Sequence, residues 1–382
     1  MSSVLEQSEI QELLRPVETD LLRHTGAEGV NWFGPGATAL YRAFQIAKHL
    51  RADNQELEVI LPSISCATPA NAALLAGVTP RFADIDPATG MLDLALTQER
   101  WTPNTCAVVF IHLFGQTADL RPLAEWCRKK NIVLIEDIAH ALGARIPGGA
   151  CVGTTGDLSV YSFNPTKIIE CGGGALLIRS RELISVLRDI CAENPLPGEI
   201  SDSEATLLGL SYRNLHHSLV ALLRERALDE VSSSFLKLQP AYRRLYLRQM
   251  KNPARLLSDW ARLPEILHHR YRNGQQYEQA LKNGPWQQIS QWRESGVCWR
   301  YSLLVDFPEK LVAFSEAVRH DGFHLSNLYW PVGDFFRPSD KCPNADRFAR
   351  RIVNLWVDQT IDQKWVARCS TSLLRNAERL AP

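Results

Sequence analysis

The chain has 382 residues, of which 45% are hydrophobic, and its 42 basic and 42 acidic side chains give a formal net charge of zero. This balance excludes the broad basic surface typical of proteins that bind nucleic acid or membrane surfaces. The N-terminus has no basic start followed by an apolar block, no apolar run is long enough for a membrane span, and the nine cysteines are scattered without a Cys-x-x-Cys pair. We therefore expect a cytoplasmic protein with reduced thiols, no bound metal, and no nucleic-acid or membrane partner.

The first part of the chain alternates between helical and strand patterns. We expect helices at residues 8–24, 37–50, 68–77 and 121–130. We expect strands at residues 29–33, 57–63, 79–86, 106–115 and 131–137. Continuous apolar strands separated by helices indicate a mostly parallel sheet that is covered on both faces.

The pattern changes after the central glycine-rich loop. Residues 157–163 and 174–180 have the pattern of paired strands around this loop, and residues 182–282 are mostly helical. A strand at 297–307, a helix at 310–322 and a strand near 323–329 follow. The sequence therefore predicts an α/β protein with a large domain at residues 1–250, which carries a helical insertion, and a small α+β domain at residues 251–382.

The loop from Ser162 to Gly174, SFNPTKIIECGGG, places Lys167 in an apolar turn before three glycines. Burying a lysine costs free energy and glycines cost backbone entropy, so this pattern favours a lysine that forms a covalent bond. A surface lysine beside a flexible loop is the simpler alternative. Asp137 closes a buried strand, at the sheet edge where α/β proteins bind ligands. The simpler alternative for Asp137 is a helix cap without a functional role.

The turn Gly34-Pro35-Gly36 opens a helix, and helix N-termini bind anions. Taken with Asp137 and Lys167, this turn indicates pyridoxal 5′-phosphate. That cofactor needs an amine to form a Schiff base, a carboxylate to keep its pyridine nitrogen protonated, and a helix N-terminus with hydroxyls for its phosphate. The three glycines would let the backbone approach the cofactor closely.

These segments resemble the DegT/StrS-type family of pyridoxal-phosphate-dependent nucleotide-sugar aminotransferases, which have the fold type I architecture of aspartate aminotransferase. The most specific similarity lies in VLIEDIAHALGARIPGG and GTTGDLSVYSFNPTKIIECGGGALL, and weaker matches occur in family order along most of the chain. The resemblance implies that Lys167 is the Schiff-base lysine, that Asp137 pairs with the pyridinium and that Ser162 binds the phosphate.

The resemblance extends to three further positions, and the sequence departs from the family at others. The resemblance places His140 near the phenolic oxygen of the cofactor, and it places Ala37 and Thr38 in the phosphate-binding turn. Cys66 stands where the family has an aromatic residue on the cofactor face, so it would either cover the ring or only pack there. The family's late histidine is absent from LYWPVGDFF, and its glutamate after the lysine is absent from Gly172-Gly173-Gly174-Ala175.

The family completes its phosphate site with an asparagine from a partner subunit, which implies a homodimer here. Two candidates match that motif imperfectly, Asn214 and Asn252, and residues that look like an insertion in 205–250 lie between them. The sequence does not choose between the two asparagines.

The resemblance implies an aminotransferase that moves an amino group from an amino acid, which it suggests is L-glutamate, to a keto sugar. That acceptor would be nucleotide-linked or a related carbonyl compound. The alternatives are another pyridoxal-phosphate enzyme, such as a lyase, aldolase or racemase, and a regulatory protein that binds the cofactor without turnover.

Overall fold

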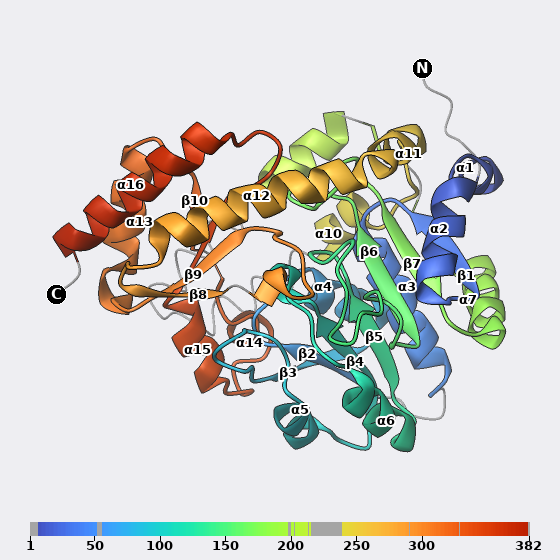
Figure 1. Cartoon of the computed structure of the whole chain (residues 1–382). Helices are drawn as coiled ribbons and strands as arrows, with labels where there is room; N and C mark the ends of the chain where they lie inside the picture. The colour runs from blue at the N-terminus through green and yellow to red at the C-terminus, as the bar shows by residue number, and fades with distance from the viewer. Residues whose placement is uncertain are drawn as a thin grey trace.

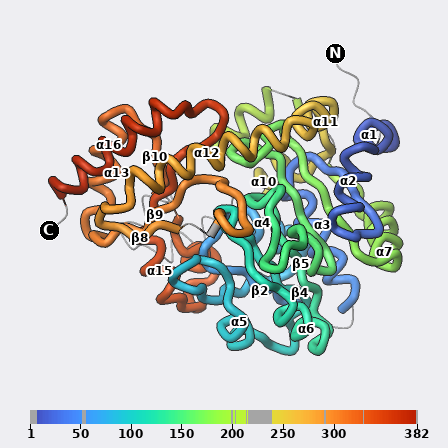
Figure 2. Tube along the Cα trace, in the orientation of Figure 1, coloured from blue at the N-terminus to red at the C-terminus, as the bar shows by residue number. Residues whose placement is uncertain are grey.

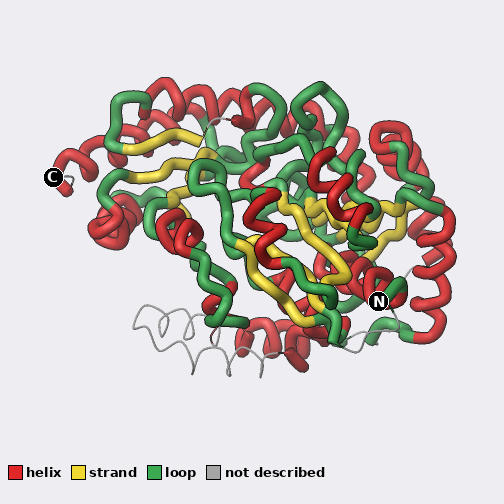
Figure 3. Tube along the Cα trace, turned by 90° about the horizontal axis from the view of Figure 1, so that it is seen from below, coloured by secondary structure: helices red, strands yellow, loops and turns green. Residues whose placement is uncertain are grey.

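The computed structural model describes residues 7–51, 56–197, 200–201, 203–212, 214, 239–289, 291–327 and 329–380. The strands of these residues form two groups that lie in different parts of the molecule (Figure 1 and Figure 3). The larger sheet has seven strands in the order β1-β7-β6-β5-β4-β2-β3, and the smaller has four in the order β10-β11-β9-β8. This arrangement confirms the predicted α/β fold with a smaller α+β part.

The larger sheet is mostly parallel. Its strands are β1 (Gly29–Phe33), β2 (Glu58–Pro62), β3 (Thr79–Ala83), β4 (Thr105–Ile111), β5 (Val133–Asp137), β6 (Leu158–Ser162) and β7 (Gly174–Ile178). The strands from β3 through β2, β4 and β5 to β6 pair in parallel, whereas β7 is antiparallel to both of its neighbours. Every residue of β4 and β5 is buried, which shows that both faces of the sheet are covered.

The helices of this part of the chain alternate with the strands. They are α1 (Gln7–Leu13), α2 (Arg15–Thr25), α3 (Gly36–His49), α4 (Thr68–Ala76), α5 (Leu94–Arg100), α6 (Arg121–Lys129) and α7 (Arg181–Glu193). The prediction of a single helix over 8–24 is wrong. The helix is interrupted at Leu14, and α2 begins after it with Pro16 in its first turn. Proline has no backbone N–H to donate, so it fits the start of a helix and not the interior.

The rest of the chain contains the smaller sheet, but part of it, including Leu256 and Phe348, packs into the core of the larger one. Its helices are α10 (Gln239–Tyr246), α11 (Pro253–Ala261), α12 (Leu263–Leu281), α13 (Leu311–His320), α14 (Gly333–Phe336), α15 (Pro343–Ala349) and α16 (Gln363–Leu380). Its strands are β8 (Trp286–Ile289), β9 (Tyr301–Val305), β10 (Leu325–Ser326) and β11 (Ile352–Leu355). The strand expected over 323–329 is reduced to two residues. Much of the predicted insertion, residues 215–238, lies outside the described residues.

Helix α12 joins the two parts, as its long path across the molecule shows (Figure 2). Ile266, near its start, belongs to the core of the large sheet, whereas Tyr277 and Leu281, near its end, belong to the core of the small sheet. None of the helices in the described part of the chain has the length and apolar character needed to cross a bilayer.

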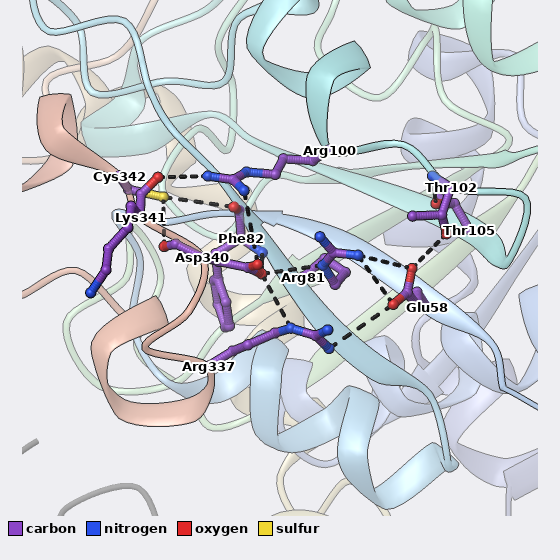
Figure 4. A network of polar contacts seen from close by, with 10 residues as sticks. All are labelled: Glu58, Arg81, Phe82, Arg100, Thr102, Thr105, Arg337, Asp340, Lys341 and Cys342. Atoms are coloured by element: carbon purple, nitrogen blue, oxygen red, sulfur yellow. Dashed lines mark hydrogen bonds and ion pairs between the residues drawn. The ribbon is translucent and has the colours of Figure 1, made fainter. Parts of the chain in front are cut away.

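A buried charge network fastens the segment after α14 to the large sheet (Figure 4). Asp340 is only 5% exposed, and its Oδ2 accepts hydrogen bonds from the Phe82 backbone N–H at 2.9 Å and from Arg81 Nε at 3.3 Å. Arg337 and Arg100 lie 3.6 Å and 3.9 Å from the same carboxylate. Three guanidinium groups therefore surround this one aspartate, and two of them, Arg81 and Arg337, also pair with Glu58.

We expect Asp340→Asn to lower the free energy of unfolding by about 3 kcal/mol, because removing the charge of Asp340 from this buried network leaves three guanidinium groups with Glu58 as their remaining carboxylate. A urea titration measures this as a lower midpoint with an unchanged slope. Asp306→Asn is the matched control: Asp306 pairs with Arg351 at 2.7 Å, but its side chain is 57% exposed, so the loss should stay below about 1 kcal/mol. Equal losses in the two variants would contradict the prediction.

Candidate active site

The carboxyl ends of three parallel strands meet at one edge of the large sheet. In the register of the sheet, Ile111 at the end of β4 lies opposite Asp137, and Asp137 at the end of β5 lies opposite Val160 of β6. Ser162 ends β6 and begins the glycine-rich loop. The sequence therefore brings Asp137 and the loop of Lys167 to the same edge of the sheet, which is where α/β sheets bind ligands.

Asp137 is 6% exposed and starts a turn, not a helix. Its Oδ1 accepts a hydrogen bond from the Ala139 N–H at 2.9 Å, while its other oxygen has no hydrogen-bond partner among the described residues. Burial raises the pKa of Asp137, and the Ala139 N–H and the positive charges of Lys167 and His112 act against that rise. A buried carboxylate with an open oxygen is suited to bind a protonated nitrogen.

Lys167 is fixed by contacts to the backbone of its loop. Thr166, the residue before it, has a φ of 76°, a conformation that costs free energy for a residue with a side chain. Trp299 Nε1 donates to the Thr166 carbonyl at 2.7 Å, and Arg270 donates to the Lys167 carbonyl at 3.2 Å. Two side chains from the smaller part of the chain therefore hold the loop in this strained form.

The amine of Lys167 lies in surroundings that disfavour its charged form. Burial lowers the pKa of Lys167, and the nearby Arg300 charge lowers it further, although Cys66 and Asp137 act in the opposite direction. A larger fraction of the amine is therefore neutral, and thus nucleophilic, than in a solvated lysine at the same pH.

The glycines after Lys167 make room for the start of helix α3. A Cβ on Gly174 would lie 2.6 Å from the Gly36 nitrogen, and a Cβ on Gly36 would lie 2.7 Å from the Ser162 Cβ. The expected close approach to a ligand is thus seen here as a close approach between two backbone segments. It places the Ser162 hydroxyl beside the N-terminus of α3, whose cap residue Pro35 makes no side-chain cap hydrogen bond.

Uncapped helix amides beside a serine hydroxyl are a site for an anion such as phosphate. Ala37 and Thr38 belong to this first turn and are fully buried. The Thr38 hydroxyl donates to the Tyr246 carbonyl at 2.7 Å and accepts from the Arg248 N–H at 3.2 Å. This hydroxyl therefore connects α3 to the segment that follows α10.

The two candidate asparagines both lie on the surface of the chain. Asn252 is exposed, immediately before α11, and follows the segment that contacts α3. Asn214 is exposed and helical. The role of either residue in a phosphate site stays a prediction.

His140 lies in a stack of parallel aromatic rings. Its ring centroid is 3.8 Å from that of Trp299 with an angle of 15° between the planes, and Phe114 stacks on Trp299 at 5.8 Å. The Phe114 N–H donates to His140 Nδ1 at 3.4 Å. Burial, with the charges of Lys167 and Arg300, holds the pKa of His140 well below its usual value, so its imidazole is neutral near pH 7.

Cys66 follows β2 at the same edge of the sheet. Its side chain is exposed, and its thiol lies close enough to Lys167 to influence the pKa of that amine. The two roles that the sequence leaves open for Cys66, covering the cofactor ring and simple packing, stay predictions.

Sequence reasoning missed three side chains of this site: Arg270, Trp299 and Arg300. Arg270 comes from α12, while Trp299 and Arg300 precede β9, far along the chain from Lys167. One signal was present, because Arg300 is a charged residue inside the otherwise apolar run VCWRYSLLV. It is the same kind of pattern that singled out Lys167.

Comparison with known proteins gives one family and one fold. The DegT/DnrJ/EryC1/StrS aminotransferase family model matches residues 10–244. One relative is dTDP-4-dehydro-2,3,6-trideoxy-D-glucose 4-aminotransferase of Saccharopolyspora spinosa, which is 36% identical to this chain over 164 residues. The aligned segment covers 42% of this chain and 41% of that protein. A second relative is a pleiotropic regulatory protein of Geobacillus stearothermophilus, which is 30% identical to this chain over 216 residues. That alignment covers 53% of this chain and 57% of the relative.

A third relative is GDP-perosamine synthase of Caulobacter vibrioides, with 40% identity over 120 residues, 31% of this chain and 32% of that protein. The chain thus matches between 32% and 57% of the length of these three relatives.

Two solved structures share the fold over nearly the whole chain. PseC of Helicobacter pylori, an aminotransferase involved in pseudaminic acid biosynthesis, has a TM-score of 0.77 at 19% identity and covers 99% of this chain and 94% of its own. The 3-amino-5-hydroxybenzoic acid synthase has a TM-score of 0.72 at 17% identity, with 96% and 91% covered. These similarities confirm the predicted fold type I architecture. Because the family match covers more than half of the sequence, the chain belongs to the DegT/DnrJ/EryC1/StrS aminotransferase family.

Proposed function

We propose that this chain is a pyridoxal-phosphate-dependent aminotransferase that acts on a keto sugar or a closely related cyclic ketone. The observation that carries the proposal is the pairing of a buried carboxylate, Asp137, with the strained and fixed loop of Lys167 at one edge of the sheet. Family membership supports it, as do relatives that are named for nucleotide-linked sugars and for scyllo-inosose.

The described residues fit pyridoxal phosphate. The close approach of Gly36 to Ser162 leaves helix amides and a hydroxyl for the phosphate. Asp137 has an oxygen with no partner in the described part of the chain, and this oxygen can pair with the pyridine nitrogen. Lys167 offers a desolvated amine for the aldehyde. When bound, this cofactor supplies an electron sink for the negative charge that develops on the substrate carbon.

The protein's own side chains then have distinct tasks. Lys167 Nζ acts as general base and acid, moving the proton at the carbon that carries the amino group. Asp137 maintains a negative charge beside the ring nitrogen throughout. His140 is held by Trp299 and Phe114, so its neutral ring can contact the cofactor without rotating.

We further propose L-glutamate or L-glutamine as the amino donor, a homodimer as the active form and the cytoplasm as its location. One relative is named L-glutamine:scyllo-inosose aminotransferase and two are named L-glutamine:2-deoxy-scyllo-inosose aminotransferase, which supports the first of these. The homodimer rests on the family resemblance, in which an asparagine of a partner subunit, here Asn214 or Asn252, completes the phosphate site.

A single-turnover experiment tests the function. Purified protein loaded with cofactor should lose its visible absorbance on addition of L-glutamate or L-glutamine. The absorbance should return when one of a panel of nucleotide-linked 3-keto or 4-keto hexoses, or scyllo-inosose, is added. No spectral change with any amino donor would instead support a regulatory protein without turnover, the alternative favoured by the relative from Geobacillus stearothermophilus. Product formation without amino transfer would indicate a lyase, aldolase or racemase.

A further inference from the structure

Arg300 differs from the other deeply buried arginines of the chain. Three arginines in the described residues are less than 9% exposed: Arg42, Arg270 and Arg300. Arg42 donates to Gln45 and to the Asn194 carbonyl, and Arg270 donates to two carbonyls of the site. Arg300, at 8% exposure, has no hydrogen-bond acceptor and no carboxylate within 4 Å among the described residues.

Two tryptophan rings hold the guanidinium of Arg300. Its central carbon lies 3.7 Å from the ring centroid of Trp356 and 4.5 Å from that of Trp299. Such stacking offsets part of the cost of burial but leaves the N–H groups at the edge of the guanidinium plane available. A buried positive charge with free donors in this orientation is suited to bind a planar anion by two parallel hydrogen bonds.

Arg300 lies at the candidate active site. Trp299, its neighbour in sequence, stacks on His140 and donates to the backbone of Thr166, the residue before Lys167. The charge of Arg300 also lowers the pKa of both Lys167 and His140, which agrees with this location. An anion bound to Arg300 would therefore lie beside the place where the amine of a substrate reacts.

We propose that Arg300 binds the α-carboxylate of the amino donor and so makes the enzyme select α-amino acids over other amines. The inference rests on the proposed aminotransferase function. An α-carboxylate is attached to the same carbon as the reacting amine, so it must lie close to Lys167. The phosphates of a nucleotide-linked acceptor are several bonds from the reacting carbonyl, and the phosphate site at the start of α3 is built from other residues.

Matched amino donors test this selectivity. Wild-type enzyme should use L-glutamate with a kcat/KM about 10²-fold higher than that for its α-amide, in which the same carboxylate is neutral. Arg300→Met should lose about 10²-fold in kcat/KM for L-glutamate, mainly through a higher KM, and should lose the preference over the amide. Arg300→Lys should recover part of both effects. The KM of the keto acceptor should be unchanged, which excludes a carboxylate of the acceptor as the ligand.

A binding measurement separates this inference from the proposed function. Glutarate has the carboxylates of L-glutamate but no amine, so it binds cofactor-loaded enzyme without reacting. Calorimetry should show binding to wild type and to Arg300→Lys, about 10-fold or more weaker binding to Arg300→Met, and unchanged binding to the control Arg272→Met, which alters an exposed arginine of α12.

The thermal midpoint and cofactor spectrum of each variant show whether it is folded. Absent glutarate binding in wild type, or equal binding in folded Arg300→Met, would overturn the role of Arg300. Arg300-dependent glutarate binding without any transamination would instead reject the proposed function while retaining the carboxylate site.

Discussion

Replacing Lys167 with alanine is expected to lower turnover by at least about 10³-fold and to remove the covalent link to pyridoxal phosphate, because Lys167 is the amine that lies beside Asp137 and would both form that bond and move the substrate proton. The fold should survive. The loop is held through the carbonyls of Thr166 and Lys167, and neither Trp299 nor Arg270 needs the lysine side chain to donate to them.

Borohydride reduction and peptide mapping measure this directly. Reduction of wild-type protein should fix the cofactor on Lys167, and reduction of Lys167→Ala should fix none. Lys282→Ala, which changes an exposed lysine next to α12, is the matched control and should label and turn over like wild type. A small amine such as methylamine should restore part of the turnover of Lys167→Ala by replacing the missing base. A label on another lysine, or activity retained by Lys167→Ala, would disprove the assignment.

The sequence predicts those parts of the site that depend on a few neighbouring residues in the chain. Asp137 could be identified because a buried apolar strand ended in a carboxylate, and parallel strands present their ends at one edge. Lys167 stood out as a charge in an apolar turn. The start of α3 could be predicted because the turn Gly34-Pro35-Gly36 is typical of a helix start, and the structure shows Gly36 packed closely against Ser162 and Gly174.

What the sequence could not predict depends on contacts between distant segments. Trp299 and Arg270 hold the Lys167 loop from more than 100 residues away, and a local pattern contains no such information. The Thr38 hydroxyl was expected near a phosphate, but its observed bonds are to Tyr246 and Arg248, more than 200 residues away. The break at Leu14 was a different error, since Pro16 was visible and its effect on the helix was underestimated.

Replacing Asp137 with asparagine is expected to leave pyridoxal phosphate bound but to lower turnover by about 10²-fold or more. The amide oxygen of asparagine can still accept the hydrogen bond that Ala139 now donates at 2.9 Å, so the turn after β5 should keep its shape. The negative charge, however, is lost. A neutral amide cannot keep a pyridine nitrogen protonated, and the charge that develops on the substrate carbon then has a weaker sink.

The carboxylate that best controls for this change is Asp157, which precedes β6 at the opposite end of the sheet. Its Oδ2 accepts from the Leu134 N–H at 2.8 Å, so Asp157→Asn also removes a charge while preserving a hydrogen bond to the backbone of β5. We expect this variant to turn over within a few-fold of wild type. Spectral titration with pyridoxal phosphate and single-turnover kinetics with the amino donor separate binding from chemistry in both variants. Near-wild-type turnover in Asp137→Asn would mean that this carboxylate only shapes the turn. Equal losses of turnover in the two variants would mean that the effect is structural and does not arise from a charge beside the cofactor.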